Sequence, residues 1–468
     1  MIKRRALLKG LAAGTAAAAT ATTFARSTTA GATPIEIVKA ESFPHVDGKA
    51  LINFERAYDV MEEEGIDGLI ALNWLNVYYL TSTVSIGTKF RSDFASFATF
   101  PRDRNQPRHF VGLVPEGWHF ANRSGEELPE LMPFSGATNW RDYIDADEAQ
   151  TKIKPETFRG GWYMNEELID TPLEKGWLDA QQKYSAIAEP GRAWALAKAL
   201  KESGLDRGII AVDDMRIKYL LESIGAADNI TFVEGRNVFR KIRHVKSTVE
   251  IELMRIGGQK NAAAALATSR SLEVGMRFED IERRFRTECA ARGNETSFII
   301  AGVSIGLLPH GQIVPGEAFL IDAVSHFRQY HGDFARTIVA GDPPKEVLRR
   351  AKANEVGREA IFNMLKPGVR YSEIRTFGRE AMVKAGMPAE AVIVNPHSVG
   401  LEHDDDPIRD DTPFPVASDV VLKAGMTITV DLPYIEAGWG AGHNEDLILI
   451  TDTGFELLNT EEEPLIVV

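Results

Sequence analysis

The sequence predicts an α/β protein of two domains, the second of which contains an internal duplication. Short apolar runs and amphipathic segments alternate along most of the 468 residues, as strands and helices do. A chain of this length exceeds the size of one ordinary hydrophobic core, so two domains are expected. The duplication is indicated by two similar segments, LEVGMRFEDIERRFRTECAARG and LKPGVRYSEIRTFGREAMVKAG, which begin 93 residues apart.

The first 30 residues resemble an export signal followed by a spacer. Arg4 and Arg5, flanked by Lys3 and Lys9, precede a run of Ala, Leu, Gly and Thr that has no acidic residue. The arginine pair resembles a twin-arginine signal, so we expect a bacterial periplasmic location. An N-terminal membrane anchor is the weaker alternative, because the Ala/Thr stretch is only weakly apolar. Elsewhere no run of about 20 apolar residues occurs, so no stable membrane insertion is expected.

The first domain is expected over residues 34–238. Its start predicts a helix from Tyr58 to Glu64, a stop at Gly65 and a buried strand from Gly68 to Leu72. Helix and strand signals continue to ITFVEG, and the basic stretch RKIRHVKS then precedes a long segment with one apolar face. We place the boundary near residues 236–245 and the second domain at residues 240–468.

Composition and charge exclude several classes of function. The chain is 44% hydrophobic and 26% charged, as soluble globular proteins are, and its formal net charge is −14. Nucleic acid is therefore not an expected partner, because phosphate binding needs clustered Lys and Arg. Cys289 is the single cysteine, which excludes an intrachain disulfide. Its setting in FRTECAARG favours a packed residue of an amphipathic helix over a nucleophile.

The two repeated segments predict two similar α/β halves that close around a central site. They align without gaps from Leu272 and Leu365, and Gly293 matches Gly386. Each copy is interpreted as a turn that leads into an amphipathic helix. Chance similarity between two helices is the alternative interpretation.

Two carboxylates interrupt the apolar pattern between these segments. GEAFLIDAVSHFRQYHGDFARTIVAG is typical of two strands joined by a polar loop, with Asp322 at the end of the first apolar run and Asp333 at the start of the second. In an antiparallel hairpin these carboxylates can lie side by side, where at least one would hold a proton unless a cation is bound. A solvated loop with two incidental acids is the alternative. His326 and His331 lie between them and are interpreted as exposed loop residues.

Three further polar interruptions complete a donor set for metal ions. His397 lies in NPHSVGLEHDDDP, Asp431 ends the strand GMTITVDLP, and Glu445 precedes the apolar run LILI. Four carboxylates and one imidazole suit two hard divalent ions such as manganese better than a lone zinc, although zinc or cobalt remain options. A dinuclear site about 3.5–4 Å across acidifies a shared water into a nucleophile.

The order of these ligands resembles the pita-bread metallopeptidases: methionine aminopeptidase, aminopeptidase P and prolidase, with the metal-free relative creatinase. The resemblance is carried by LIDA and GDFARTIVAG, PHSVGLEH, GMTITVDLP and NEDLILIT, and extends to NVYYLTS and IRHVKSTVEIELMR in the first half. It implies a creatinase-like α/β amino-terminal domain before a pita-bread catalytic domain. It also implies that the metal ligands are Asp322, Asp333, His397, Asp431 and Glu445.

The resemblance implies further roles and also shows departures. His310 and His403 match two histidines that contact substrate and assist proton transfer, and Asp431 matches the ligand that accepts a proton. His403 follows the ligand histidine by six positions instead of seven, which leaves Asp404 as a competing occupant. The family's glutamate is Asp431 here, and His443 and Ile393 replace an arginine and a histidine of proline-specific members.

The expected function is metal-dependent hydrolysis of short peptides by an Xaa-Pro aminopeptidase or dipeptidase, in a homodimer. The replaced residues leave two alternatives: an amidohydrolase or lyase that acts on a small non-peptide carboxylate, and a non-catalytic binding module. The run from Asp404 to Asp406 is interpreted as a solvated turn before Pro407.

Overall fold

The structure is a computed structural model of the whole chain. It describes residues 42–93, 96–121, 127–135, 152–155, 163–304, 311–409, 413, 416–417, 419–459 and 463–468, all within one compact unit, Ile37–Val468. The expected export signal and His310 lie outside the described residues.

A six-stranded mixed sheet forms the amino-terminal half, with the strand order β4-β3-β2-β1-β5-β6. Its strands are β1 Gly68–Ala71, β2 Phe97–Pro101, β3 His109–Leu113, β4 Glu130–Phe134, β5 Gly208–Val212 and β6 Ile230–Glu234. Its helices are α2 Phe54–Glu63, α3 Trp74–Thr81, α4 Ile86–Phe90, α5 Gly117–Ala121, α7 Pro172–Ile187, α8 Arg192–Glu202 and α9 Arg216–Glu222.

Local sequence explains how this half begins. The Asn53 side chain caps α2 by accepting a hydrogen bond from the amide of Arg56 at 3.2 Å. Gly65 has φ +68°, a conformation that favours glycine, and the helix has ended just before it. Every residue of β1 is buried. The helix, stop and buried strand therefore follow the order expected from the sequence.

The carboxy-terminal half contains two larger sheets. The seven-stranded sheet has the path β14-β15-β8-β9-β16, with β7 beside β8 and β19 beside β9, and the four-stranded sheet is ordered β10-β13-β17-β18. Their strands are β7 Glu295–Gly302, β8 Ala318–Phe327, β9 Tyr330–Val339, β10 Asn395–Ser398, β13 Thr427–Asp431, β14 Tyr434–Glu436, β15 Gly440–Gly442, β16 Glu445–Asp446, β17 Ile448–Ile450, β18 Phe455–Leu457 and β19 Leu465–Val467. A separate small pair is formed by β11 Ile408–Arg409 and β12 Val416–Ala417.

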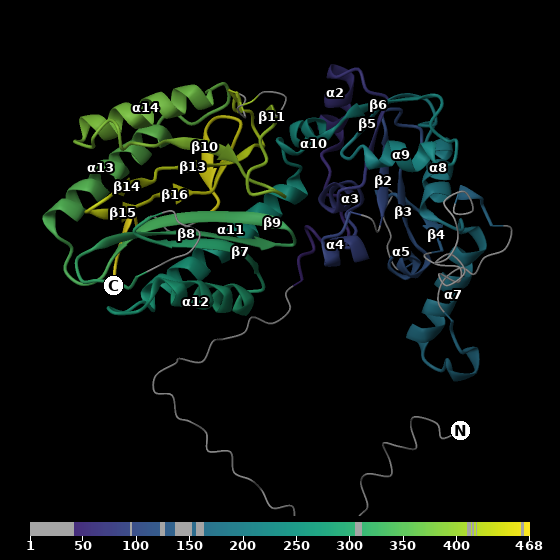
Figure 1. Ribbon diagram of the computed structural model, residues 1–468, viewed down its shortest axis with the longest axis horizontal. Coiled ribbons are helices and arrows are strands. Elements are labelled where there is room, and N and C mark those ends of the chain that lie inside the picture. The colour runs from purple at the N-terminus through teal and green to yellow at the C-terminus, as the bar shows by residue number, and fades with distance from the viewer. Residues whose placement is uncertain are drawn as a thin grey trace, which may run out of the picture. The chain divides into compact units, whose positions relative to one another are not determined.

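The repeated segments adopt the same local structure. Helix α12, Phe278–Ala291, and helix α14, Tyr371–Lys384, start 93 residues apart and each contain 14 residues. Gly293 and Gly386, which follow them, both have positive φ. Helix α11, Thr248–Arg270, and helix α12 pack on the seven-stranded sheet. Helix α13, Lys345–Phe362, packs on α14. Figure 1 shows α13 and α14 on one side of the strands and α12 on the other.

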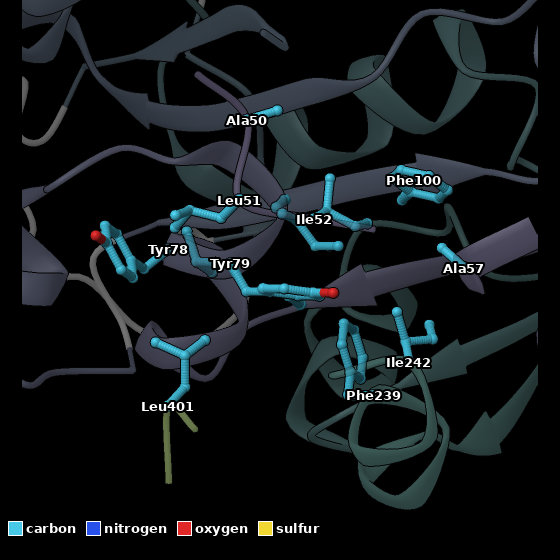
Figure 2. Packing of buried hydrophobic residues seen from close by; sticks show 14 of the residues in the cluster. Ala50, Leu51, Ile52, Ala57, Tyr78, Tyr79, Phe100, Phe239, Ile242 and Leu401 are labelled. Carbon is cyan, nitrogen blue, oxygen red and sulfur yellow. The ribbon is translucent and has the colours of Figure 1, made fainter. Parts of the chain in front are cut away.

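The two halves share one hydrophobic cluster. It includes Tyr78 and Tyr79 of α3, Phe239 of α10, Arg236–Arg243, and Leu401 from the loop after β10. Figure 2 shows Leu401 close to the helix that carries the two tyrosines. The loop after β10 is therefore packed against the amino-terminal half.

Buried charges hold the same loop. Arg243 of α10 pairs with Asp405 and Glu402 and also donates to the side chain of Asn76. Burial opposes the charge of Arg243, but Asp405 and Glu402 outweigh it and raise its pKa. Next to this pair, His244 Nε2 lies 2.7 Å from Asp406 Oδ1.

The acidic run was therefore interpreted wrongly from the sequence as a solvated turn. Asp405 is fully buried and Asp406 is 7% exposed, and only Asp404 is exposed. The reason is the basic segment that includes Arg243 and His244, which meets the run in space 162 residues away in sequence.

The histidines of the β8–β9 hairpin are also less exposed than expected. His326 is 4% exposed and lies opposite His331 in the ladder, with the two ring centroids 5.4 Å apart. His331 lies beside the carbonyl of Gly400, with Nδ1 3.1 Å from its oxygen. Burial lowers the pKa of His331 to about 4. The strands run further than the sequence indicated, so the polar loop is shorter.

Cys289 is buried in α12, which agrees with the packed residue expected from the sequence. Among the described residues, no helix has the length and apolar character needed to cross a membrane.

Asp405→Ala should lower the free energy of unfolding by about 3–5 kcal/mol, because Arg243 would keep its charge in a buried position without its fully buried carboxylate partner. Denaturant unfolding followed by circular dichroism measures this loss. The matched control is Asp404→Ala in the same run, which should cost about 1 kcal/mol or less because that side chain is exposed. Equal losses in the two variants would contradict a stabilising role for the buried pair.

Candidate metal centre

The first two acidic residues lie on one face of the β8–β9 hairpin. Asp322 is opposite Ala335 in the antiparallel ladder, and Asp333 is two residues from Ala335 on the same strand. Side chains two residues apart on a strand share a face, so the two carboxylates are diagonal neighbours. The sequence prediction that a hairpin brings them together is confirmed.

Glu445 extends this row to a third strand. In the β9–β16 ladder Glu445 is also opposite Ala335, so Ala335 lies between Asp322 and Glu445 on the same face. A methyl group at the middle position leaves space between the two carboxylates. Leu447 then connects β16 of the seven-stranded sheet to β17 of the four-stranded sheet. This crossing explains why a polar segment directly precedes a buried apolar strand.

The second sheet supplies His397 and Asp431. His397 on β10 is opposite Thr429 on β13, and Asp431 is two residues further along that strand. The His397 Nε2 atom lies 3.6 Å from Asp431 Oδ1, 3.7 Å from Glu445 Oε1 and 4.0 Å from Asp333 Oδ2. The cluster therefore forms where the faces of two sheets meet, with the imidazole near its middle.

Glycines allow the close packing that sets these positions. A Cβ atom added at Gly332 would lie 2.6 Å from the Cβ atom of Asn261 and 2.8 Å from the carbonyl oxygen of Gly257. Both neighbours belong to α11, so only glycine lets this helix approach β9 directly before Asp333. The Asn261 side chain in turn donates to the carbonyl of Ala323, next to Asp322, at 2.7 Å.

A buried ion pair supports Glu445 from the other side. Arg336 donates to the carbonyl oxygen of Glu445 at 2.8 Å and to Asp446 Oδ1 at 2.6 Å. Arg358 and Asn459 also bond to the Asp446 carboxylate. The backbone at Glu445 is therefore fixed by charged side chains that point away from the cluster.

Burial and mutual repulsion shift the pKa values of the cluster. Burial, reinforced by Asp333 and Asp431, raises the pKa of Asp322 well above its usual range. Burial and the same two aspartates raise the pKa of Glu445 as well. Burial would also raise the pKa of Asp431, but its interactions with Glu445 and His397 outweigh that effect and lower it. Without a cation, these shifts therefore favour the protonated forms of Asp322 and Glu445.

His397 responds in the opposite way to its surroundings. Burial alone would lower its pKa, but Asp431 and Glu445 outweigh that effect and raise the pKa of His397 well above its usual value. Among the five cluster residues, His397 is therefore the one whose pKa shift favours a positive charge, which would offset the negative charge of the carboxylates. A divalent ion would supply that charge directly and release the proton.

Unpaired buried atoms indicate that the cluster fits cations. Asp322 Oδ1, both carboxylate oxygens of Asp333 and Glu445 Oε1 are buried without a hydrogen-bond partner, which is costly for acceptors unless an ion binds them. Three donor sets each bring their ligand atoms within 4.8 Å of one another: Asp333, His397 and His403; His397, Asp431 and Glu445; Asp322, His443 and Glu445. Because Glu445 belongs to two sets, the arrangement fits two adjacent ions that share a carboxylate.

His403 lies at the edge of this cluster. Its Nε2 atom is 3.0 Å from Asp333 Oδ2, an ion-pair distance without the angles of a hydrogen bond, and its side chain is 38% exposed. Asp404 is exposed instead and accepts the amide of Asp406 at 3.1 Å. His403, not Asp404, therefore occupies the site despite the shorter spacing. Its role, like that of His310, stays a prediction.

Sequence reasoning missed His443. It was considered only as the replacement for an arginine, yet the structure groups it with Asp322 and Glu445. Burial lowers its pKa, which favours the neutral imidazole. Its position two residues before Glu445 was the available signal, but only the bend between β15 and β16 brings its ring to the cluster.

Comparisons with known proteins agree with this fold and site. Metallopeptidase family M24 matches residues 252–452, which include all residues of the cluster. The probable dipeptidase PepE of Mycobacterium tuberculosis is 24% identical over 307 residues, 62% of this chain and 76% of its own length. The Xaa-Pro dipeptidase of Pyrococcus furiosus is 26% identical over 256 residues, 53% of this chain and 72% of its own.

A solved structure shows the same fold. The dipeptidase of Pyrococcus horikoshii OT3 superposes with a TM-score of 0.64 at 17% identity, covering 88% of this chain and 99% of that one. The protein is thus a two-domain α/β protein of the pita-bread class. Within its carboxy-terminal half, residues 252–452 match metallopeptidase family M24.

Removal of divalent ions with a chelator should lower the temperature of the unfolding midpoint, because ions bind only the folded cluster. An ion at 100 times its Kd stabilises the folded state by about 2.7 kcal/mol. A carboxyl with a raised pKa keeps its proton more tightly in the folded than in the unfolded state. The ion-free protein therefore loses this contribution to stability as pH rises. The gain from added metal should be larger at about pH 8 than at about pH 5.5, since the protons of Asp322 and Glu445 must leave first.

Differential scanning calorimetry of wild type and Asp322→Asn, with and without metal, measures both effects. A metal-induced gain that is independent of pH, or identical in Asp322→Asn, would contradict the assignment of Asp322 as a ligand.

Proposed function

We propose that the protein hydrolyses short peptides at Xaa-Pro bonds, as an aminopeptidase or dipeptidase that uses two divalent ions. The observation that supports it best is the pair of donor sets that share Glu445. Two ions held in this way acidify water at neutral pH and polarise a carbonyl group. The names of the Mycobacterium and Pyrococcus relatives support a dipeptide or Xaa-Pro substrate. The comparisons do not favour the non-peptide alternatives.

The residues of this chain divide the remaining work. Asp431 is the proposed proton acceptor: its carboxylate is partly open to the site, at 20% side-chain exposure, and Asn395 holds its Oδ2 at 3.0 Å. His403 is proposed to donate to the carbonyl oxygen of the substrate as charge develops there, since its ring is partly exposed beside Asp333. The same task is proposed for His310, on the sequence resemblance alone.

Manganese is the proposed metal, with zinc or cobalt as options. Asp322, Asp333, Asp431 and Glu445 contribute only oxygen, the donor that hard divalent ions prefer. A nitrogen-rich set would favour zinc or cobalt instead.

Location and assembly are proposed from the sequence. The twin-arginine resemblance supports export of the folded, metal-loaded protein to the periplasm. A homodimer that pairs through the amino-terminal domain is supported by the family resemblance.

A substrate panel tests the proposed reaction. Purified protein with added manganese should cleave Xaa-Pro dipeptides or longer Xaa-Pro peptides faster than non-proline dipeptides. Asp333→Asn should reduce kcat/KM by more than about a hundredfold, because it removes a buried ligand. His403→Gln should reduce kcat, whereas Asp404→Asn, its exposed neighbour, should leave kcat unchanged.

Turnover of dipeptides alone would identify a dipeptidase. Absence of peptide cleavage by a fully metal-loaded protein, together with turnover of creatine or a β-sulfonio carboxylate, would contradict the peptidase proposal and support the amidohydrolase or lyase alternative.

Replacement of Arg4 and Arg5 by lysines should trap the precursor in the cytoplasm, because the transport machinery reads the arginine pair and not its charge. Cell fractionation followed by immunoblotting measures the distribution. Lys9→Arg is the control, since it keeps both the pair and the charge. Unimpaired export of the double-lysine variant would exclude this route.

A further inference from the structure

His443 replaces an arginine of proline-specific relatives, so the family resemblance gives it no role. Its backbone is fixed on both sides by Thr337 of β9: the amide donates to Thr337 Oγ1 at 3.0 Å, and the carbonyl accepts from the same hydroxyl at 3.3 Å. A Cβ atom added at the preceding Gly442 would lie 2.9 Å from that hydroxyl. The bend is therefore held tightly against β9.

The imidazole itself is buried without compensation. His443 is 4% exposed, and its Nε2 atom has no hydrogen-bond partner. A buried ring nitrogen that neither donates nor accepts is unfavourable, so its burial needs an explanation. If this side chain only filled space, an apolar side chain could do so without leaving a polar atom unpaired.

The two carboxylates grouped with this ring also carry unpaired atoms. Asp322 Oδ1 and Glu445 Oε1 are also buried without hydrogen-bond partners. His443, Asp322 and Glu445 each offer a ligand atom, and these atoms lie within 4.8 Å of one another. Carboxylate oxygens and an imidazole nitrogen that converge in this way, unpaired and buried, form a typical coordination set for a transition metal ion.

We propose that His443 is a direct ligand of the divalent ion that Asp322 and Glu445 hold. Each of the two donor sets that share Glu445 would then supply one imidazole, His443 in one set and His397 in the other. The inference rests on the proposed two-ion centre and adds a ligand to it. Nitrogen donors raise affinity for metals late in the Irving–Williams series, so this site should prefer cobalt or zinc over manganese more strongly than an all-oxygen site would.

Calorimetric titration of chelator-treated protein with Co²⁺ and Mn²⁺ tests the proposal. Wild type should bind two ions. His443→Gln should raise the Kd of one ion at least about tenfold, the loss expected for removal of even a supporting group. The loss should be larger for Co²⁺ than for Mn²⁺. His326→Gln is the matched control: it removes an equally buried histidine, 4% exposed, that lies outside all three donor sets and should leave both affinities unchanged.

Proton NMR of the Co²⁺-loaded protein provides a readout independent of activity. His443→Gln should lose the strongly shifted ring resonances of one histidine, and His326→Gln should retain them all. A crystal structure of the metal-loaded wild type avoids any dependence on variant folding and should place Nε2 of His443 about 2.0–2.2 Å from a metal ion.

The proposal would be overturned if His443→Gln kept the wild-type affinities and all the shifted resonances. It would also be overturned by a separation of more than about 3 Å between His443 Nε2 and the metal ion. Either result would leave the two-ion centre intact. Failure of the wild type to bind two ions would overturn the two-ion centre itself. The two failures are therefore distinguishable.

Discussion

Mutual repulsion among buried carboxylates is the constraint on which the carboxy-terminal half depends. Asp322, Asp333, Asp431 and Glu445 come together at the junction of two sheets, where water cannot screen them. Without a cation, this closeness raises the pKa values of Asp322 and Glu445 and also that of His397, which favours protonated forms of all three. A fold that places like charges so close, and leaves several of their oxygens without hydrogen bonds, is organised around the cations that would neutralise them.

The surrounding structure keeps these side chains in place. Small residues, among them Ala335 and Gly332, leave room between the carboxylates and let α11 approach the hairpin. Charged support faces the other way, because Arg336 and Asp446 fix the strand that carries Glu445 without entering the cluster. The division is physical: carboxylates and imidazoles gather on the face toward the cluster, and Arg336 pairs with Asp446 on the opposite face.

Much of this arrangement is readable from the sequence because it rests on local pattern. Periodicity predicted the strands that carry Asp322 and Asp333, and the 93-residue offset predicted helices α12 and α14 residue for residue. The errors concern contacts between distant segments. Asp405 appeared solvated because its partner Arg243 is 162 residues away, and His443 became a ligand candidate only through a bend whose direction depends on Thr337.

The loop after β10 has a consequence for the independence of the two halves. Leu401 packs near Tyr78 and Tyr79 of the amino-terminal half. Asp405 pairs with Arg243 of α10, the helix between the two halves, which itself contacts α2. The segment between His397 and Pro407 is therefore held from the amino-terminal side. A proteolytic cut near residue 245 would therefore leave two fragments that adhere to each other. If the carboxy-terminal half were expressed alone, the loop that carries His403 would lack these supporting contacts. The amino-terminal half acts as an intramolecular scaffold for the active-site loop, not as a detachable accessory.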